Sequence, residues 1–199
     1  TDFVAINDKF KTFLSEVASQ VIELGAEGYS EKTTEEGTAP KEFFTDTIAG
    51  LGENIVYLDG VKWDQKDNTV FGSYVHSNGK IGVLVELESA NPEGTEVAKE
   101  VAMHIAASQV EAISSDELDP AILEKEKAFL IDQAKDSGKP ENIIEKMVMG
   151  RLQKFKKEIC LLDQPFVKSP DLSISQLLKQ EGKKLGTDLK VVKFEKFTF

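Results

Sequence analysis

The sequence contains two histidines, and histidine is the usual base beside a catalytic nucleophile. His76 lies in SYVHSNG next to a turn signal, where we expect an exposed, solvated side chain. His104 lies in VAMHIAAS, inside a helical pattern whose apolar face it flanks. A lone histidine in that place is more often structural than catalytic, and no nucleophile can be assigned beside it. Met103 and His104 together would make a contact patch for another protein.

Metal and phosphate chemistry have no motif in this sequence. It has no HExxH, no cysteine pair and no EF-hand loop. The stretches SNGKIG and DSGKPE contain Gly-Lys but not the earlier glycine of a phosphate-binding loop. The 35 acidic residues guarantee some close carboxylate pairs, so such pairs carry no information. We therefore expect no enzyme activity, no cofactor and no metal ion, and a function that depends on the protein's surface.

The charge distribution narrows the class of partner. The net charge is −11, and nucleic acids and anionic membranes are polyanions that would repel such a chain. Residues 1–150 hold 13 Lys/Arg and 29 Asp/Glu, whereas residues 151–199 hold 11 and 6. Basic and aromatic residues do not alternate in this end as they do in RNA-binding proteins, so we interpret it as a solvated face.

The cysteine content and the hydropathy pattern give an expectation for the compartment. The single cysteine, Cys160, cannot form an intramolecular disulfide and lies in the apolar run EICLL, which suits a reducing compartment. No apolar run is long enough to cross a membrane, and the first residues lack the pattern of a signal peptide. The sequence predicts a soluble, intracellular protein.

The first half of the chain must position these residues on helices and β-hairpins. An amphipathic helix is predicted after Asn7 or Asp8 as N-cap, with Gly25 beyond its end, and a short helix is predicted around residues 41–52. Three β-type runs follow at residues 53–64, 68–77 and 80–89, and the signal SNG joins the last two as a hairpin. An antiparallel meander is the simplest interpretation.

The second half repeats part of this pattern. The apolar pattern of a predicted helix over residues 95–114 matches that of the first helix after a shift of about 88 residues. This match favours a duplicated strand-and-helix unit. In such a unit TDFVA lies where a strand gives way to a helix. Two helices within residues 120–157 are predicted to form an antiparallel hairpin, either a plain part of the domain or a coiled coil that contacts a partner. A short helix and a final strand, expected in the second sheet, end the chain.

The fold class is therefore α+β. We expect a first subdomain over residues 1–89 and a second over residues 90–199, which includes the helical hairpin at residues 120–157.

Several stretches resemble the translation elongation factor Ts family, the nucleotide exchange factors of elongation factor Tu. They are TDFVAINDKF, GKIGVLVEL, VAMHIAAS and the long block from SGKPENIIEKM to SISQLL, and the similarity runs in register over nearly all of the chain. The resemblance implies two related α+β subdomains, each with an antiparallel sheet packed on helices, and a coiled coil inserted in the second. It also implies an allosteric exchange of GDP in which no covalent bond changes.

The resemblance assigns roles to particular residues. Asp2 and Phe3 match the pair that reaches into the GTP-binding domain of elongation factor Tu, with Phe3 as an apolar wedge and Asp2 as its polar companion near the Mg²⁺ site. Further contacts with the same partner match a second group of residues, which is Ile81, Gly82, Val83, Met103 and His104. The resemblance implies neither direct nucleic-acid binding nor membrane binding, and it leaves open whether the protein forms a homodimer. It places the protein in the bacterial cytoplasm or in an organelle.

The sequence departs from the family in places that affect this expectation. The family's N-terminal helical domain, the strand before TDFV and the C-terminal extension of some members are not present, and Ile6 replaces a polar or basic residue. We expect weaker exchange than from a longer chain. The competing hypotheses are a non-catalytic scaffold that binds a partner through residues 120–157 and, with little support, a hydrolase that uses His104.

Overall fold

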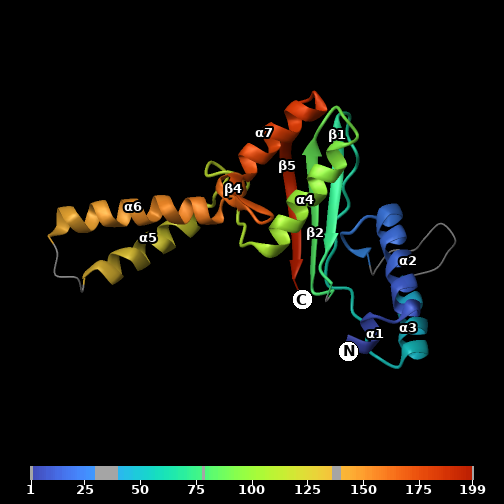
Figure 1. The fold of residues 1–199 in the computed structure, drawn as a ribbon. Coiled ribbons are helices and arrows are strands. Elements are labelled where there is room, and N and C mark those ends of the chain that lie inside the picture. The colour runs from blue at the N-terminus through green and yellow to red at the C-terminus, as the bar shows by residue number, and fades with distance from the viewer. Residues whose placement is uncertain (1, 30–39, 78, 136–139, 199) are drawn as a thin grey trace. The chain divides into compact units, whose positions relative to one another are not determined.

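The chain divides into two compact units, Thr1–Gln65 and Lys66–Phe199, and each is described by itself. The computed structural model describes residues 2–29, 40–77, 79–135 and 140–198 (Figure 1). Helices and antiparallel strands both occur, so the predicted α+β class is confirmed. The boundary predicted after residue 89 and the relatedness of two subdomains stay predictions, because compact units and sequence repeats need not coincide.

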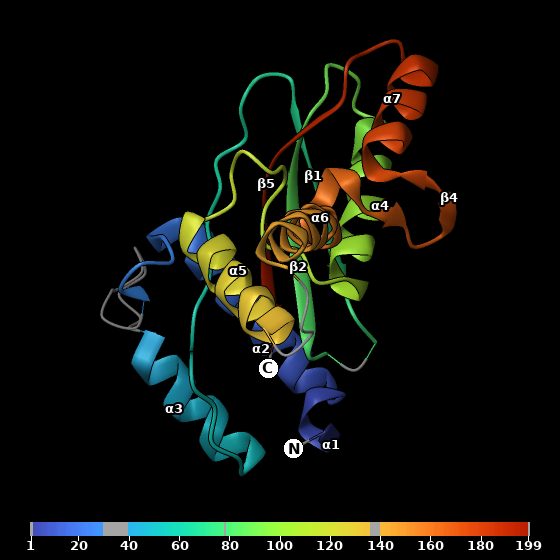
Figure 2. The same ribbon diagram turned by 90° about the vertical axis from the view of Figure 1, so that its left-hand side faces the viewer.

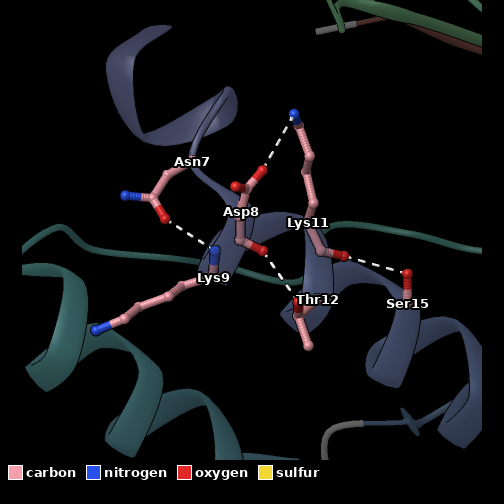
Figure 3. Close-up of polar contacts among 6 residues, drawn as sticks. All are labelled: Asn7, Asp8, Lys9, Lys11, Thr12 and Ser15. Atoms are coloured by element: carbon pink, nitrogen blue, oxygen red, sulfur yellow. Dashed lines mark hydrogen bonds and ion pairs between the residues drawn. The ribbon is translucent and has the colours of Figure 1, made fainter.

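The first unit begins with the short helix α1 (Asp2–Ala5), followed by α2 (Asp8–Leu24) and α3 (Pro40–Leu51). The predicted N-cap of α2 is confirmed at Asn7, whose side chain accepts a hydrogen bond of 2.8 Å from the Lys9 N–H (Figure 3). The helix ends at Gly25, as predicted, with a φ of 82° that suits glycine.

Aromatic rings form the core of the first unit. Phe13 of α2 is buried, and its ring centroid lies 5.0 Å from that of Phe43 and 4.9 Å from that of Phe44 on α3. Tyr29 is also buried, and its hydroxyl donates a hydrogen bond of 2.6 Å to the Gln20 side chain. These rings hold α2 and α3 together.

The predicted strand over residues 53–64 is wrong. The residues of this run are of β type, and their exposure alternates, with Val56 and Leu58 exposed. However, a strand exists only where its backbone groups pair with a neighbour, and no segment that the structure describes forms a ladder with this run. The predicted three-stranded meander is therefore reduced to one hairpin.

The second unit is built on a three-stranded antiparallel sheet of order β1-β2-β5, formed by β1 (Thr69–Val75), β2 (Ile81–Glu88) and β5 (Lys190–Thr198). The predicted hairpin is confirmed, since β1 and β2 pair antiparallel with Val75 opposite Gly82. Asn78 of its turn lies outside the described residues. The last strand pairs with β2 although about 100 residues separate them in sequence.

Helix α4 (Gly94–Ala107) covers one face of this sheet (Figures 1 and 2). The approach is so close that a Cβ on Gly72 of β1 would overlap the backbone of Ala98. Apolar residues of α4 and the strands form the main core, among them Val83, Val85, Leu87, Val97, Val101 and Ile105. Lys196 of β5 donates to the carbonyls of Ile105 and Ser108, which stabilises the negative end of the α4 dipole.

Helices α5 (Pro120–Lys135) and α6 (Glu141–Ile159) pack along each other and extend from the sheet (Figure 1). Leu130 and Ala134 of α5 form an apolar cluster with Val148 of α6. We call this pair of helices the arm. The link between them at residues 136–139 lies outside the described residues, and the coiled-coil geometry stays a prediction.

The chain then passes through the 3₁₀ turn η2 (Leu161–Asp163) and the two-stranded ribbon of β3 (Pro165–Phe166) and β4 (Ser169–Ser173). Helix α7 (Ile174–Leu185) follows and begins with a capping box, in which Ser173 and Gln176 bond each other's backbone N–H groups.

Candidate functional site: a protein-binding surface

Within the described ranges, no three His, Cys, Asp or Glu side chains are grouped so that they could hold a metal ion. None of the helices in these ranges combines the length and the hydropathy that a membrane span requires.

Phe3 lies on α1 and is 85% exposed. The turn that follows Phe3 is closed by the Asn7 N–H, which donates to the Val4 carbonyl at 3.0 Å. Residues Asp2–Ala5 are helical and do not form the end of a strand. For Asp2 the structure describes only the backbone, which belongs to the same helix.

The predicted contacts Ile81, Gly82 and Val83 form the start of β2, and they differ in what they present. Val83 is 4% exposed and belongs to the main core, and Ile81 packs against that core half-buried. A Cβ on Gly82 would meet no described atom within 4 Å, so the backbone at this position is open on one side. Ile81 and Gly82 are both half-buried, so these two offer surface to a partner and the buried side chain of Val83 does not.

Met103 and His104 lie in the last turns of α4. Met103 is half-buried, whereas His104 is 1% exposed and both of its ring nitrogens are bonded within the protein. Its Nδ1 accepts a hydrogen bond of 3.2 Å from the Val167 N–H, so the proton must be on Nε2, which donates to Oε1 of Gln164 at 2.8 Å. His104 therefore has no ring nitrogen left to offer a partner.

The environment of His104 keeps its imidazole neutral. Burial lowers the pKa of His104 below its ordinary value, and the hydrogen bond with Gln164 opposes this effect in part. Protonation would also remove the lone pair that accepts the Val167 N–H. The ring is thus held in one tautomer and one orientation.

The sequence prediction missed Gln164. This residue is 4% exposed and lies in the stretch DQPF, but a single glutamine before a proline carries no periodic or motif signal of burial. A surface recess of about 420 Å³ lies over the His104 and Gln164 pair and is rimmed by Lys154, Lys157 and Asp163.

Glu86 of β2 was also missed. Its side chain is fully buried, and its carboxylate lies 3.1 Å from the Lys193 ammonium on β5 and 4.0 Å from that of Lys66. Because Lys193 is the cross-strand partner of Glu86, this pair holds the bulged region of the sheet in register.

The structure brings two of the predicted segments together. Val83 at the start of β2 is paired with Lys196 of β5, and the Lys196 ammonium bonds the carbonyl of Ile105, the residue after His104. The start of β2 and the end of α4 thus lie at one end of the second unit. Phe3 belongs to the first unit and is considered by itself.

Comparisons with known proteins agree on one family. A family model described as Elongation factor TS matches residues 1–199. The chain is similar to proteins named Elongation factor Ts from Clostridioides difficile (40% identity) and Clostridium perfringens (41% identity), in each case over 99% of this chain and 66% of the relative. A protein of the same name from Lawsonia intracellularis is 36% identical over 98% of this chain and 70% of its own length. The chain spans about two thirds of the length of these relatives.

Proposed function

Because the chain belongs to the elongation factor Ts family, we propose that it binds elongation factor Tu carrying GDP and promotes release of the nucleotide during translation elongation. The family match over the whole chain carries this proposal. The relatives are bacterial, so we place this activity in the bacterial cytoplasm.

The proposed mechanism is a coupling between two binding equilibria and needs no chemical step by this chain. A partner that prefers the nucleotide-free form of a GTPase must weaken nucleotide binding by the same factor by which nucleotide weakens the partner. Coupling of this kind needs a surface that inserts into the GTPase. It does not need a nucleophile or a metal ion on the exchange factor.

Phe3 is the side chain best suited to such an insertion. A phenylalanine that is 85% exposed leaves a large apolar area in water. Burial of this area in a partner contributes a binding free energy of roughly 25 cal/mol per Å². In this proposal Phe3 enters the GTP-binding domain, Asp2 acts beside it, and the half-buried Ile81 and Gly82 provide a second contact, while the buried Val83 supports them from the core. Met103 completes the surface at the end of α4.

The test is the rate of release of fluorescent GDP from elongation factor Tu. We expect Asp2→Ala with Phe3→Ala to lower the stimulated rate at least about tenfold. This change lies within the usual range of factors by which one bound partner alters the affinity for another. Unfolding in urea should be unchanged, since Phe3 contributes little buried area. Ile22→Ala, which removes another exposed apolar side chain (65% exposed) from α2, is the matched control and should retain the rate. Equal rates for the double variant and the control would refute the role of Phe3.

A scaffold role for the arm is the second candidate. Phe129 of α5 and Met149 of α6 are 56% and 58% exposed, which gives the arm an apolar surface of its own. In that case the double variant at Asp2 and Phe3 would keep its partner, whereas Phe129→Ala with Met149→Ala would lose it. Measuring the affinity of both variants for elongation factor Tu separates the two candidates.

A further inference from the structure

The side chain of Gln164 joins separate segments of the second unit. Its Oε1 accepts from His104 on α4, and its Nε2 donates at 2.7 Å to the carbonyl of Gln109 and at 2.6 Å to that of Glu158. Gln109 follows α4, and Glu158 lies in the last turn of α6. The one amide group therefore connects α4 to the root of the arm.

His104 determines which way this amide points. Because Nδ1 is occupied by the Val167 N–H, Nε2 carries the proton and requires an acceptor, which is the side-chain oxygen of Gln164. The NH₂ group of Gln164 then points at the carbonyls of Gln109 and Glu158, which need a donor. A reversed amide would place its oxygen against two carbonyl oxygens and its NH₂ against the Nε2–H. The hydrogen-bond pattern thus has a single solution.

The carbonyls that Gln164 holds lie where both ends of the arm meet the rest of the unit. A parallel bridge pairs Ala112, upstream of α5, with Cys160, which follows α6. Next to it the Glu111 N–H donates to the Ile159 carbonyl at 3.0 Å, and the Leu161 N–H donates to the Ala112 carbonyl at 2.9 Å. Figure 1 shows α6 ending beside β4 at this place. Gln164 closes this junction on the side of α4.

We propose that His104 is a positioning residue: acting through Gln164, it fixes the direction in which the arm leaves α4 and the sheet, and partner binding depends on His104 by this route. The part that concerns the partner rests on the proposed function. The part that concerns the arm rests on the hydrogen bonds alone. The family resemblance suggested a direct contact by His104, and its burial at 1% exposure argues for an indirect one.

Two substitutions of His104 separate its two bonds. The amide of glutamine reaches the place of Nε2, so His104→Gln can keep the donor to Gln164 and loses the acceptor for Val167. The amide of asparagine reaches the place of Nδ1, so His104→Asn can keep the acceptor and loses the donor. If the bond to Gln164 carries the effect, His104→Gln retains the direction of the arm and His104→Asn does not.

The first experiment measures the arm in the full chain. Spin labels are attached after Lys146→Cys on α6 and Lys179→Cys on α7, both exposed positions, while the buried Cys160 stays unlabelled. We expect one narrow distance distribution for the otherwise unchanged protein and for His104→Gln, and a broad one for His104→Asn and for Gln164→Glu. The last variant keeps the shape of the side chain and replaces its two N–H donors by an oxygen. A broad distribution before any substitution at 104, or equal distributions in the two His104 variants, would overturn the proposal.

The second experiment measures release of fluorescent GDP from elongation factor Tu. We expect His104→Asn to lower the rate about fivefold or more, within the usual range of coupling factors, and His104→Gln to stay within about twofold of the unchanged chain. His76→Asn, at the exposed histidine, is the control and should have no effect. A direct contact predicts instead that both His104 variants lose the rate while the label distances stay narrow. If the chain without substitutions does not stimulate release of GDP from elongation factor Tu, the proposed function fails. The distances between the spin labels still decide whether His104 positions the arm.

Discussion

Burial of His104 couples the proton equilibrium of its imidazole to folding. The pKa of His104 is lowered in the folded state, so as the pH falls below the ordinary value of 6.5 the unfolded chain takes up the proton first. The stabilisation that comes from the neutral, bonded ring is therefore complete above pH 6.5. It is lost as the pH falls toward the folded-state pKa.

This effect can be measured as a difference between two proteins. We predict that the free energy of unfolding in urea falls more steeply between pH 7.5 and pH 5.5 for the unchanged chain than for His104→Gln. The comparison cancels the titration of the many carboxylates, which both proteins share. A difference between the two proteins that stays constant over this range would contradict the assignment of a buried neutral imidazole.

The packing of α4 on the sheet depends on Gly72 of β1. A Cβ at this position would overlap the backbone of Ala98 and Lys99, so helix and strand would have to separate. We predict that Gly72→Ala destabilises the protein by about 1–3 kcal/mol or more, the usual cost of overpacking a core. The measurement is unfolding in urea.

Gly82→Ala is the matched control for this prediction. Gly82 lies on the neighbouring strand, and an added Cβ there meets no described atom within 4 Å. The stability of Gly82→Ala should change by less than about 0.5 kcal/mol, because the added methyl group displaces no neighbouring atom. Equal destabilisation by both substitutions would show that loss of a strand glycine, and not the approach of α4, is responsible.

At the scale of the whole molecule the two units differ in the size of their cores. The second unit has one large apolar cluster that joins the sheet, α4 and α7, whereas the buried apolar side chains described in the first unit are Phe13, Val21, Tyr29 and Pro40. Since the free energy of local opening follows the apolar area that must be exposed, the two units should open separately.

Hydrogen exchange followed by mass spectrometry tests this difference. We predict that backbone amides of α2 and α3 exchange well before those of α4 and β2 at the same pH and temperature. The pH dependence of the chemical exchange rate applies to both units, so it does not affect the order. Exchange of α2 as slow as that of α4 would mean that the units unfold together.

Local patterns in the sequence determined most of the helices and the hairpin. The apolar spacing of α2, its cap at Asn7 and its end at Gly25 involve residues within a few turns of each other, and so does the turn between β1 and β2. The long motifs that resemble elongation factor Ts are likewise read directly from the chain, and the family was assigned correctly from them. These features do not depend on how distant segments meet.

Only the tertiary structure decided which residues pair across long separations. Residues 53–64 are of β type and yet form no strand, because a strand requires a partner that composition does not specify. His104 was found from its place on a helix, but its burial and its bond with Gln164, 60 residues away, depend on how the root of the arm meets α4. The sequence therefore determined the elements and the family, whereas the contacts between distant elements decided which of the predicted site residues, such as Phe3 and Gly82, are open to a partner.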